Sequence, residues 1–111
     1  MVGDKSILIK TFGDYPALRI IDFLIESSMF DYPITDIAKH SNVHFQTFKK
    51  IWPRFIKNKF VVKTRKLGNS YLYKINKENP IIQKIIELDK FLCEQYANKA
   101  LKKKVIMKSY R

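Results

Sequence analysis

The chain has 111 residues, of which 46% are hydrophobic and only three are glycine, so its composition predicts one folded domain and argues against a disordered chain. No apolar run approaches the roughly 20 residues that cross a bilayer, and Met1–Lys10 lacks the pattern of a signal peptide. A single cysteine, Cys93, excludes an internal disulfide framework and suits a reducing compartment. These features together predict a small, soluble, cytoplasmic domain without a membrane partner.

The chain is strongly basic: 22 lysine and arginine residues against 10 acidic residues give a net charge of +12. The placement of this charge is more informative than its size. No acidic residue lies between Asp36 and Glu78, an interval that holds half of the lysines and arginines. A lysine-rich surface alone explains abundant lysine but not a stretch without acids, so we expect this interval to face a polyanion.

The first two segments are a short apolar run and a helix. Residues 6–13, with the sequence SILIKTFG, are consistent with an edge strand or an N-terminal arm. Asp14 is a suitable N-cap, and Pro16 suits the first helical turn, where its missing N–H costs nothing. The apolar residues that follow predict a helix to about Ser27.

The next segment has the pattern of a helix-turn-helix. Tyr32 precedes a proline, which favours an extended break in the chain. Thr35 or Asp36 can then cap a short helix that ends before a turn at Ser41-Asn42. This turn lacks the glycine often found there, and Asn42 is the expected substitute because asparagine tolerates a left-handed backbone.

The second helix of this pair starts near His44 and contains Pro53, which lacks an N–H and crowds the preceding turn. Phe48 and Phe55 nevertheless stay in phase on one side of it. The sequence therefore predicts either one kinked helix or two short pieces nearly in line, with Pro53 on the solvent side and Asn58 at the end.

A β-hairpin and a long helix complete the chain. Segments 60–66 and 71–76 alternate and flank the turn sequence Gly68-Asn69. Asn79 as N-cap and Pro80 in the first turn then start a helix that we expect to end near Lys104. At roughly 24 residues it would extend ~36 Å, longer than a domain of this size can cover. Strict alternation in the first strand places Val61, Lys63 and Arg65 on one face and Phe60, Val62, Thr64 and Lys66 on the other.

This order of elements is that of a winged helix-turn-helix domain, mainly α with a small antiparallel β-hairpin and a long C-terminal helix. Four stretches, FGDYPALRIIDFLIE, FDYPITDIAK, FKKIWPRF and YLYKINKENPIIQKIIELD, together resemble archaeal winged-helix transcriptional regulators over about Lys10 to Cys93. That family is similar in fold to the MarR and ArsR types, which usually bind duplex DNA as homodimers. The resemblance implies that Pro53 is tolerated in the third helix. His44-Phe45 stands where the family often has a small polar residue, so sequence preference stays open.

The resemblance and the element order divide the chain into three parts. Residues 1–78 form the winged helix-turn-helix DNA-binding domain, residues 79–104 the dimerisation helix and residues 105–111 a basic tail.

The second helix of a helix-turn-helix enters the major groove, where its first turns approach base edges. Gln46 can pair with adenine, and Lys49 or Lys50 with guanine. Phe45 either covers a thymine methyl or staples the helix start, and Thr47 can reach a phosphate. In the wing, Arg65 and Lys66 are the strongest candidates for contacts to the DNA backbone. The full set of candidate DNA-binding residues is His44, Phe45, Gln46, Thr47, Lys49, Lys50, Arg54, Lys63, Arg65, Lys66, Asn69 and Lys74.

The apolar stripe of the last helix covers nearly half of its circumference, which favours a homodimer over a helix that only folds back to complete the core. A two-fold axis would then place two recognition helices about one DNA turn, ~34 Å, apart. The candidate interface residues are Ile81, Ile82, Ile85, Leu88, Leu92 and Tyr96.

Several other functions have no support in the sequence. His40 and His44 are separated by a turn and have no carboxylate or cysteine near them in sequence, so we expect no metal. Cys93 is interpreted as a small buried apolar group. No phosphate-binding glycine loop, nucleophile elbow or acid–base pair is present, so we expect no cofactor and no enzyme.

The sequence therefore favours a homodimeric, sequence-specific regulator that binds double-stranded DNA, and a repressor because no separate activation or ligand domain is visible. Two alternatives remain. One is a sequence-tolerant DNA binder, such as a chromatin, plasmid-partition or replication accessory protein. The other is a winged-helix module that binds an acidic protein partner.

Overall fold

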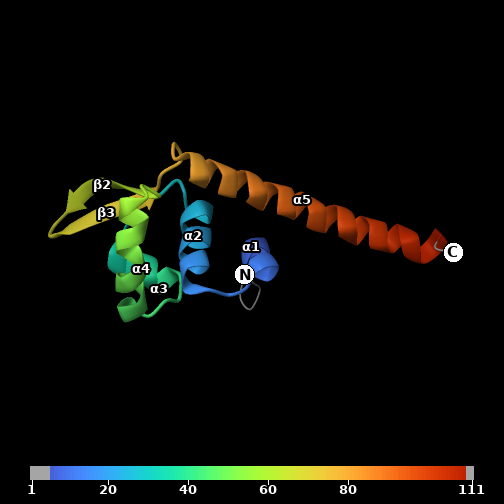
Figure 1. Ribbon diagram of the computed structural model, residues 1–111, viewed down its shortest axis with the longest axis horizontal. Coiled ribbons are helices and arrows are strands. Elements are labelled where there is room, and N and C mark those ends of the chain that lie inside the picture. The colour runs from blue at the N-terminus through green and yellow to red at the C-terminus, as the bar shows by residue number, and fades with distance from the viewer. Residues whose placement is uncertain (1–5, 110–111) are drawn as a thin grey trace.

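The computed structural model describes residues 6–109, with side chains described as far as Lys99. Its elements are α1 (Ile7–Phe12), α2 (Pro16–Glu26), β1 (Tyr32–Pro33), α3 (Ile34–His40), α4 (Phe45–Lys57), β2 (Val61–Leu67), β3 (Ser70–Ile75) and α5 (Pro80–Ser109). The strands form an antiparallel sheet of order β1-β3-β2. Helices α2, α3 and α4 pack together, the β2–β3 wing projects on one side and α5 extends on the other (Figure 1). This is the winged helix-turn-helix fold with a long C-terminal helix that the sequence predicts.

The core is centred on Phe48 of α4, which is fully buried. Its ring stacks on Trp52 with 4.9 Å between centroids, and Ile20 and Leu24 of α2 belong to the same cluster. Val61, at the start of the wing, also belongs to it. Helix α4, helix α2 and the base of the wing are therefore fixed to one another by a single apolar core.

The N-terminal run is a helix, so the expectation of a strand or an arm is wrong. Ser6 is its N-cap, and the Ser6 Oγ accepts a hydrogen bond of 3.2 Å from the N–H of Ile9. Leu8 and Ile9 are buried, and α1 contacts both α2 and α5. A serine cap and burial of two apolar residues on one turn explain why this short segment is helical.

The N-cap residues of α2 and α3 differ from those that the sequence predicts. Tyr15, not Asp14, is the N-cap of α2, and the carboxylate of Asp14 accepts a hydrogen bond of 3.2 Å from Arg19 instead. Pro16 is the first residue of α2, as predicted. In α3 the N-cap is Pro33, before Thr35 and Asp36, and no side chain caps this helix. The preceding segment pairs with β3, so the helix begins as soon as this pairing ends.

The turn of the helix-turn-helix has the left-handed residue where the sequence predicts it. Asn42 has φ of 58°. Its N–H donates to the carbonyl of Lys39, and the N–H of Val43 donates to that of Ala38, at 3.1 and 2.9 Å. These two bonds define a Schellman motif, which satisfies the last carbonyls of α3 and turns Val43 into the core.

Helix α4 is continuous from Phe45 to Lys57, so Pro53 does not split it into two pieces. Pro53 lies on the exposed side, and Asn58 is the C-cap, both as predicted. The helix keeps its register because Phe48 and Phe55, on either side of the proline, are both buried in the core. Burial on the opposite side of the helix therefore outweighs the loss of one backbone hydrogen bond.

Helix α5 starts as predicted and runs further than expected. The Asn79 Oδ1 accepts hydrogen bonds from the N–H groups of Ile81 and Ile82, at 2.8 and 3.2 Å. The helix has 30 residues and ends at Ser109, beyond the predicted end near Lys104. The side chains of the predicted basic tail, 105–111, lie outside the described residues. At about 45 Å, α5 accounts for the elongated shape, 63 × 28 × 21 Å, and extends well past α1 (Figure 1).

Within residues 6–109, no helix combines the length and the apolar character that membrane crossing requires.

Asp22 of α2 is half-buried, and this burial raises its pKa from 3.8 to about 6. The neighbouring carboxylates of Glu26 and Asp89 also raise this pKa, while a hydrogen bond with Ser6 lowers it. The folded state therefore holds the Asp22 proton more tightly than the unfolded state does. The resulting stabilisation is fully present below about pH 4 and is lost as the pH rises through 6.

We expect Asp22→Asn to raise the free energy of unfolding at pH 7.5 by about 1 kcal/mol, because it removes a carboxylate that is costly to ionise. Two pKa units correspond to roughly 3 kcal/mol, and solvent screening of a half-exposed group reduces this value. Urea unfolding at pH 7.5 and pH 4 measures the difference, with exposed Glu78→Gln as control. Equal stabilisation by Asp22→Asn at both pH values contradicts this assignment.

Candidate nucleic-acid interface

The side of α4 that faces away from the core is polar and basic. Phe48, Trp52 and Phe55 are buried on one side, so the helical period turns the residues between them outward. Thr47 is half-buried at the boundary. Among the predicted contact residues, those exposed on this helix are Phe45, Gln46, Lys49, Lys50 and Arg54, and Lys57 extends the same side.

Phe45 packs inward while part of its ring stays exposed. The ring is 39% exposed and stacks on Phe48 with 6.0 Å between centroids and planes 10° apart. The Lys49 Nζ lies 5.7 Å from the centroid of the Phe45 ring. Phe45 therefore fixes the start of α4 and also orients one of its two neighbouring lysines, Lys49 and not Lys50.

A β-bulge in β2 interrupts the alternation of the wing. Lys63 lies opposite Tyr73, whereas Arg65 lies opposite Leu72, which is adjacent to Tyr73 in β3. Thr64 is thus an extra residue in β2 without a partner in the register.

The bulge decides which basic residues share a face. Lys63 lies opposite Tyr73 and Lys66 opposite Tyr71, and alternate residues of β3 face the same way. Lys63 and Lys66 therefore share one face, and Arg65 points from the other. The prediction from strict alternation, that Lys63 and Arg65 share a face, is wrong because it counts Thr64 as a regular strand residue.

Tyr71 gathers the two lysines on the first face. The Nζ atoms of Lys63 and Lys66 lie 3.9 and 5.5 Å from the centroid of its ring. Tyr73, two residues further along the same face, contacts the ring of Trp52 edge-on, so this face is turned towards α4. Sequence reasoning did not identify Tyr71, because only the bulged register brings both lysines over one aromatic ring.

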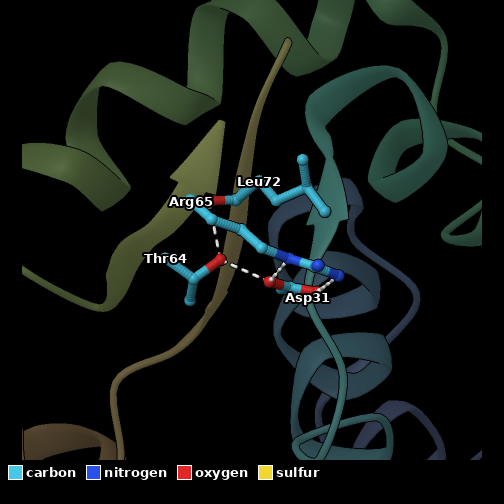
Figure 2. A network of polar contacts seen from close by, with 4 residues as sticks. All are labelled: Asp31, Thr64, Arg65 and Leu72. Atoms are coloured by element: carbon cyan, nitrogen blue, oxygen red, sulfur yellow. Dashed lines mark hydrogen bonds and ion pairs between the residues drawn. The ribbon is translucent and has the colours of Figure 1, made fainter. Parts of the chain in front are cut away.

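Arg65 forms an ion pair with Asp31, which lies in the loop between α2 and β1 (Figure 2). Its Nε donates to Asp31 Oδ2 at 3.0 Å and its Nη2 to Oδ1 at 3.2 Å. The Thr64 Oγ1 donates to Asp31 Oδ2 at 2.5 Å. The hydrogen bonds from Arg65 and then Thr64 lower the pKa of Asp31 to about 2, so this carboxylate is ionised at neutral pH. Asp31 could not be identified from the sequence because it lies outside the basic interval.

The remaining predicted wing residues are Asn69, in the turn, and Lys74, on the face of the sheet opposite to Lys63 and Lys66. Asn69 lines a hollow of about 380 Å³ between the tip of the wing, the start of α3 and Trp52. Thr35, Ser70 and Tyr71 bring hydroxyl groups to the same hollow. Lys74 is half-buried on the face of the sheet that carries Leu72. Of the predicted wing set, the structure brings together Lys63 and Lys66, and separates Arg65 and Lys74 from them.

The two histidines have structural surroundings. His40 stacks on Phe23 with 5.3 Å between ring centroids and contacts Tyr32 at 5.7 Å. His44 is the N-cap residue of α4 without a side-chain capping bond. In the part of the chain that the structure describes, no group of three or more His, Cys, Asp or Glu side chains is placed to hold a metal ion.

Cys93 of α5 is exposed, so the expectation that it is buried is wrong for the single chain. Partial desolvation and then the carboxylate of Asp89 raise the pKa of its thiol, which disfavours the reactive thiolate.

The surface of α5 shows which candidate interface residues are available to a partner. Ile82 is fully buried in the core of its own chain, so, contrary to the prediction, it has no surface left for contact with a second copy. Ile85 and Leu92 are half-buried. The exposed large apolar residues of α5 within the described side chains are Ile81, Leu88, Phe91 and Tyr96, of which Phe91 was not in the predicted set.

The sequence matches no protein-family model and no curated protein. Solved structures with a similar fold include AntR and NadR. The AntR antimony-specific transcriptional repressor has 23% sequence identity and a TM-score of 0.57, and the match covers 83% of this chain and 78% of AntR. NadR, solved in complex with 4-hydroxyphenylacetate, has 20% identity and a TM-score of 0.60, with 93% of this chain and 74% of NadR covered. At these identities the likeness establishes the winged-helix fold.

Proposed function

We propose that the protein is a homodimeric transcriptional regulator that binds double-stranded DNA sequence-specifically and acts as a repressor. The observation that carries this proposal is a basic surface formed by α4 and one face of the wing. Lys50 and Arg54 extend from α4, and Lys63 and Lys66 lie over Tyr71 on the wing face turned towards α4. No acidic residue interrupts the sequence from 37 to 77. The fold shared with the repressor AntR supports the same role.

In this proposal α4 lies in the major groove. Gln46 and Lys50 are exposed in its first two turns, where a recognition helix meets base edges, so they are the proposed base-reading residues. Lys49 is held over the ring of Phe45 and is assigned to the phosphate backbone. Arg54, further along the helix, is assigned to a phosphate as well. Base contacts then provide specificity, while the phosphate contacts provide affinity and salt dependence.

The proposed partner for α5 is a second copy of the same helix. Helix α5 is about 45 Å long and exposes Leu88, Phe91 and Tyr96 beyond the part that packs on the core. A hollow lined by Pro80, Ile81, Lys84, Ile85 and Leu88 continues this apolar surface towards the start of the helix. An antiparallel or crossed pair of such helices would bury these residues and set the distance between two recognition helices.

We expect Leu88→Glu to convert the dimer into a monomer, because it places a charge in the proposed apolar contact. Sedimentation velocity at about 20 μM, roughly the range in which a micromolar dimer is assembled, measures the mass. Lys90→Ala, an exposed change two residues away on the same helix, is the matched control and should leave the mass unchanged. A Leu88→Glu variant that still sediments as a dimer would contradict a dimer through this part of α5.

Selection of bound duplexes from a random DNA library, at about 150 mM salt to suppress non-specific binding, tests the function directly. An enriched inverted repeat with half-sites about one turn apart is the expected result. Binding without enrichment would favour a chromatin, partition or replication accessory protein. No retained DNA would favour a protein-interaction module with an acidic partner.

If the selection yields an operator, Gln46→Ala and Lys50→Ala should each relax the preference at one base pair and cost about 1–3 kcal/mol of binding free energy. A uniform loss over all sequences would instead assign these residues to phosphates. Repeating the selection with each variant separates the two outcomes.

A further inference from the structure

We infer that Asp31 and Arg65 form a latch that positions the wing, and that the wing meets DNA through Lys63 and Lys66 and not through Arg65. The inference rests on the proposed DNA-binding function and assigns separate tasks to residues that the sequence places in one group. Arg65 is then a positioning residue, and Asp31 is part of the DNA-binding apparatus although it carries a negative charge.

The latch joins two elements on opposite sides of the central strand. The sheet order is β1-β3-β2, Asp31 directly precedes β1, and Arg65 belongs to β2. The arginine therefore reaches across β3 to make its two hydrogen bonds with the carboxylate (Figure 2). The side chain of Asp31 is only 17% exposed, against 62% for Arg65. The carboxylate is thus the fixed member of the pair and the arginine the part of the wing that it holds.

The bulge residue strengthens the same connection. The Thr64 Oγ1 lies 2.5 Å from Asp31 Oδ2 and 3.2 Å from the carbonyl oxygen of Leu72. One hydroxyl group therefore contacts both the loop and the central strand. Together with Arg65, Asp31 receives three hydrogen bonds from two adjacent wing residues. A carboxylate held by a bidentate guanidinium and a hydroxyl has a defined orientation, which a single surface ion pair lacks.

The wing needs such support because little else holds its outer part. β1 pairs with β3 at only two positions, Tyr32 with Tyr73 and Pro33 with Leu72. Outward from there, residues 63–71 are all exposed. A two-stranded hairpin without an apolar face is marginally stable in water. The latch lies at the base of this exposed part, where it can fix the direction of the whole hairpin.

The latch and the proposed DNA contacts use opposite faces of the wing. Arg65 points from the face that carries Leu72, while Lys63 and Lys66 lie over Tyr71 on the other. The latch can therefore stay closed while the two lysines meet phosphates. Because the latch already orders the hairpin, binding through the two lysines costs little further conformational entropy of the wing.

Asp31→Ala distinguishes this role from simple electrostatics, because the two predict changes of opposite sign. Removal of an acid beside a basic surface should tighten DNA binding if charge alone matters. Loss of the latch should instead weaken binding about fivefold, since the wing must then be ordered at the moment of association. Asp36→Ala, which removes an exposed acid from α3, is the matched control and should tighten binding slightly. Tighter binding by Asp31→Ala would overturn the inference.

A double-mutant cycle tests whether Asp31 acts through Arg65. We expect Asp31→Ala to have a much smaller effect in an Arg65→Ala background than in the wild type, because only the hydrogen bond from Thr64 to Asp31 is then left to lose. Arg65→Ala should keep the salt dependence of binding, whereas Lys66→Ala should reduce its logarithmic slope by about one. A reduced slope for Arg65→Ala, or additive losses in the double variant, would show that Arg65 contacts DNA directly and would overturn the inference.

Amide hydrogen exchange of the free protein tests the latch without DNA. Asp31→Ala and Arg65→Ala should each increase exchange in residues 62–72 and leave α4 unchanged. Unchanged exchange in the wing overturns the latch, whatever the DNA result. If the wild-type chain binds no DNA, the proposed function fails, and the exchange experiment still decides whether Asp31 orders the wing.

Discussion

The quadruple variant Lys50→Ala, Arg54→Ala, Lys63→Ala and Lys66→Ala is expected to bind operator DNA roughly a thousandfold more weakly than the wild type at moderate salt. Each side chain is exposed on the proposed basic surface, and a charge contact to DNA contributes on the order of 1 kcal/mol, so four of them account for this loss. The slope of log K against log salt concentration should become less negative by roughly 3, because Arg54, Lys63 and Lys66 are the three proposed phosphate contacts. Fluorescence anisotropy with a labelled operator over a range of salt concentrations measures both quantities.

A second variant separates the position of these charges from their number. Lys10, Lys90 and Lys99 are exposed on α1 and α5, away from α4, the wing and the hollow of the proposed dimer surface. Their replacement by alanine removes three positive charges, against four in the first variant. We expect a much smaller loss of affinity and a nearly unchanged salt slope. Equal losses in the two variants would mean that the chain binds DNA through its overall charge, and the assignment of the interface to α4 and the wing would be wrong.

Phe48→Ala is expected to lower the free energy of unfolding by 3–5 kcal/mol, the cost of removing a fully buried aromatic side chain and leaving a cavity. Phe48 stacks on both Trp52 and Phe45, so its loss removes contacts along the first two turns of α4. Against a total stability of roughly 5–15 kcal/mol for a domain, this is a large fraction. Urea unfolding followed by circular dichroism measures the change.

Phe30→Ala provides the control for Phe48→Ala, because the Phe30 side chain is exposed. The expected change for this surface substitution is within about 0.5 kcal/mol. A loss of less than about 1 kcal/mol for Phe48→Ala would contradict the placement of this ring at the centre of the core.

Local chemistry in the sequence predicted most of the fold. Asn42 in the turn, Asn58 at the end of α4, and Asn79 with Pro80 at the start of α5 act through their own backbone or immediate neighbours, and each lies where expected. The exposed side of α4 could be predicted for a similar reason, since a helix with Phe48 and Phe55 in the core has only one side left for its lysines. Periodicity and capping thus sufficed wherever the determining residues are close in sequence.

The parts that could not be predicted depend on residues distant in sequence. The bulge at Thr64 is defined by the register between β2 and β3, and alternation within β2 contains no sign of it. The partner of Arg65 is 34 positions away, in a loop with no basic residue to draw attention to it. Helix α1 has a local cap in Ser6, but a helix of six residues also depends on the burial of Leu8 and Ile9 in the folded chain. In each case tertiary contacts, and not local propensity, decide the structure.

The bulge has a consequence for the comparison of related wings. Lys63 and Arg65 lie opposite neighbouring residues of β3, so a chain without Thr64 could form a regular hairpin with every other pairing unchanged. Homologous wings that differ in length by one residue could then present the same lysines on the same face. An alignment that puts the gap in the turn at Gly68-Asn69 would match Arg65 and Lys66 to the wrong positions, whereas a gap at Thr64 preserves the correspondence.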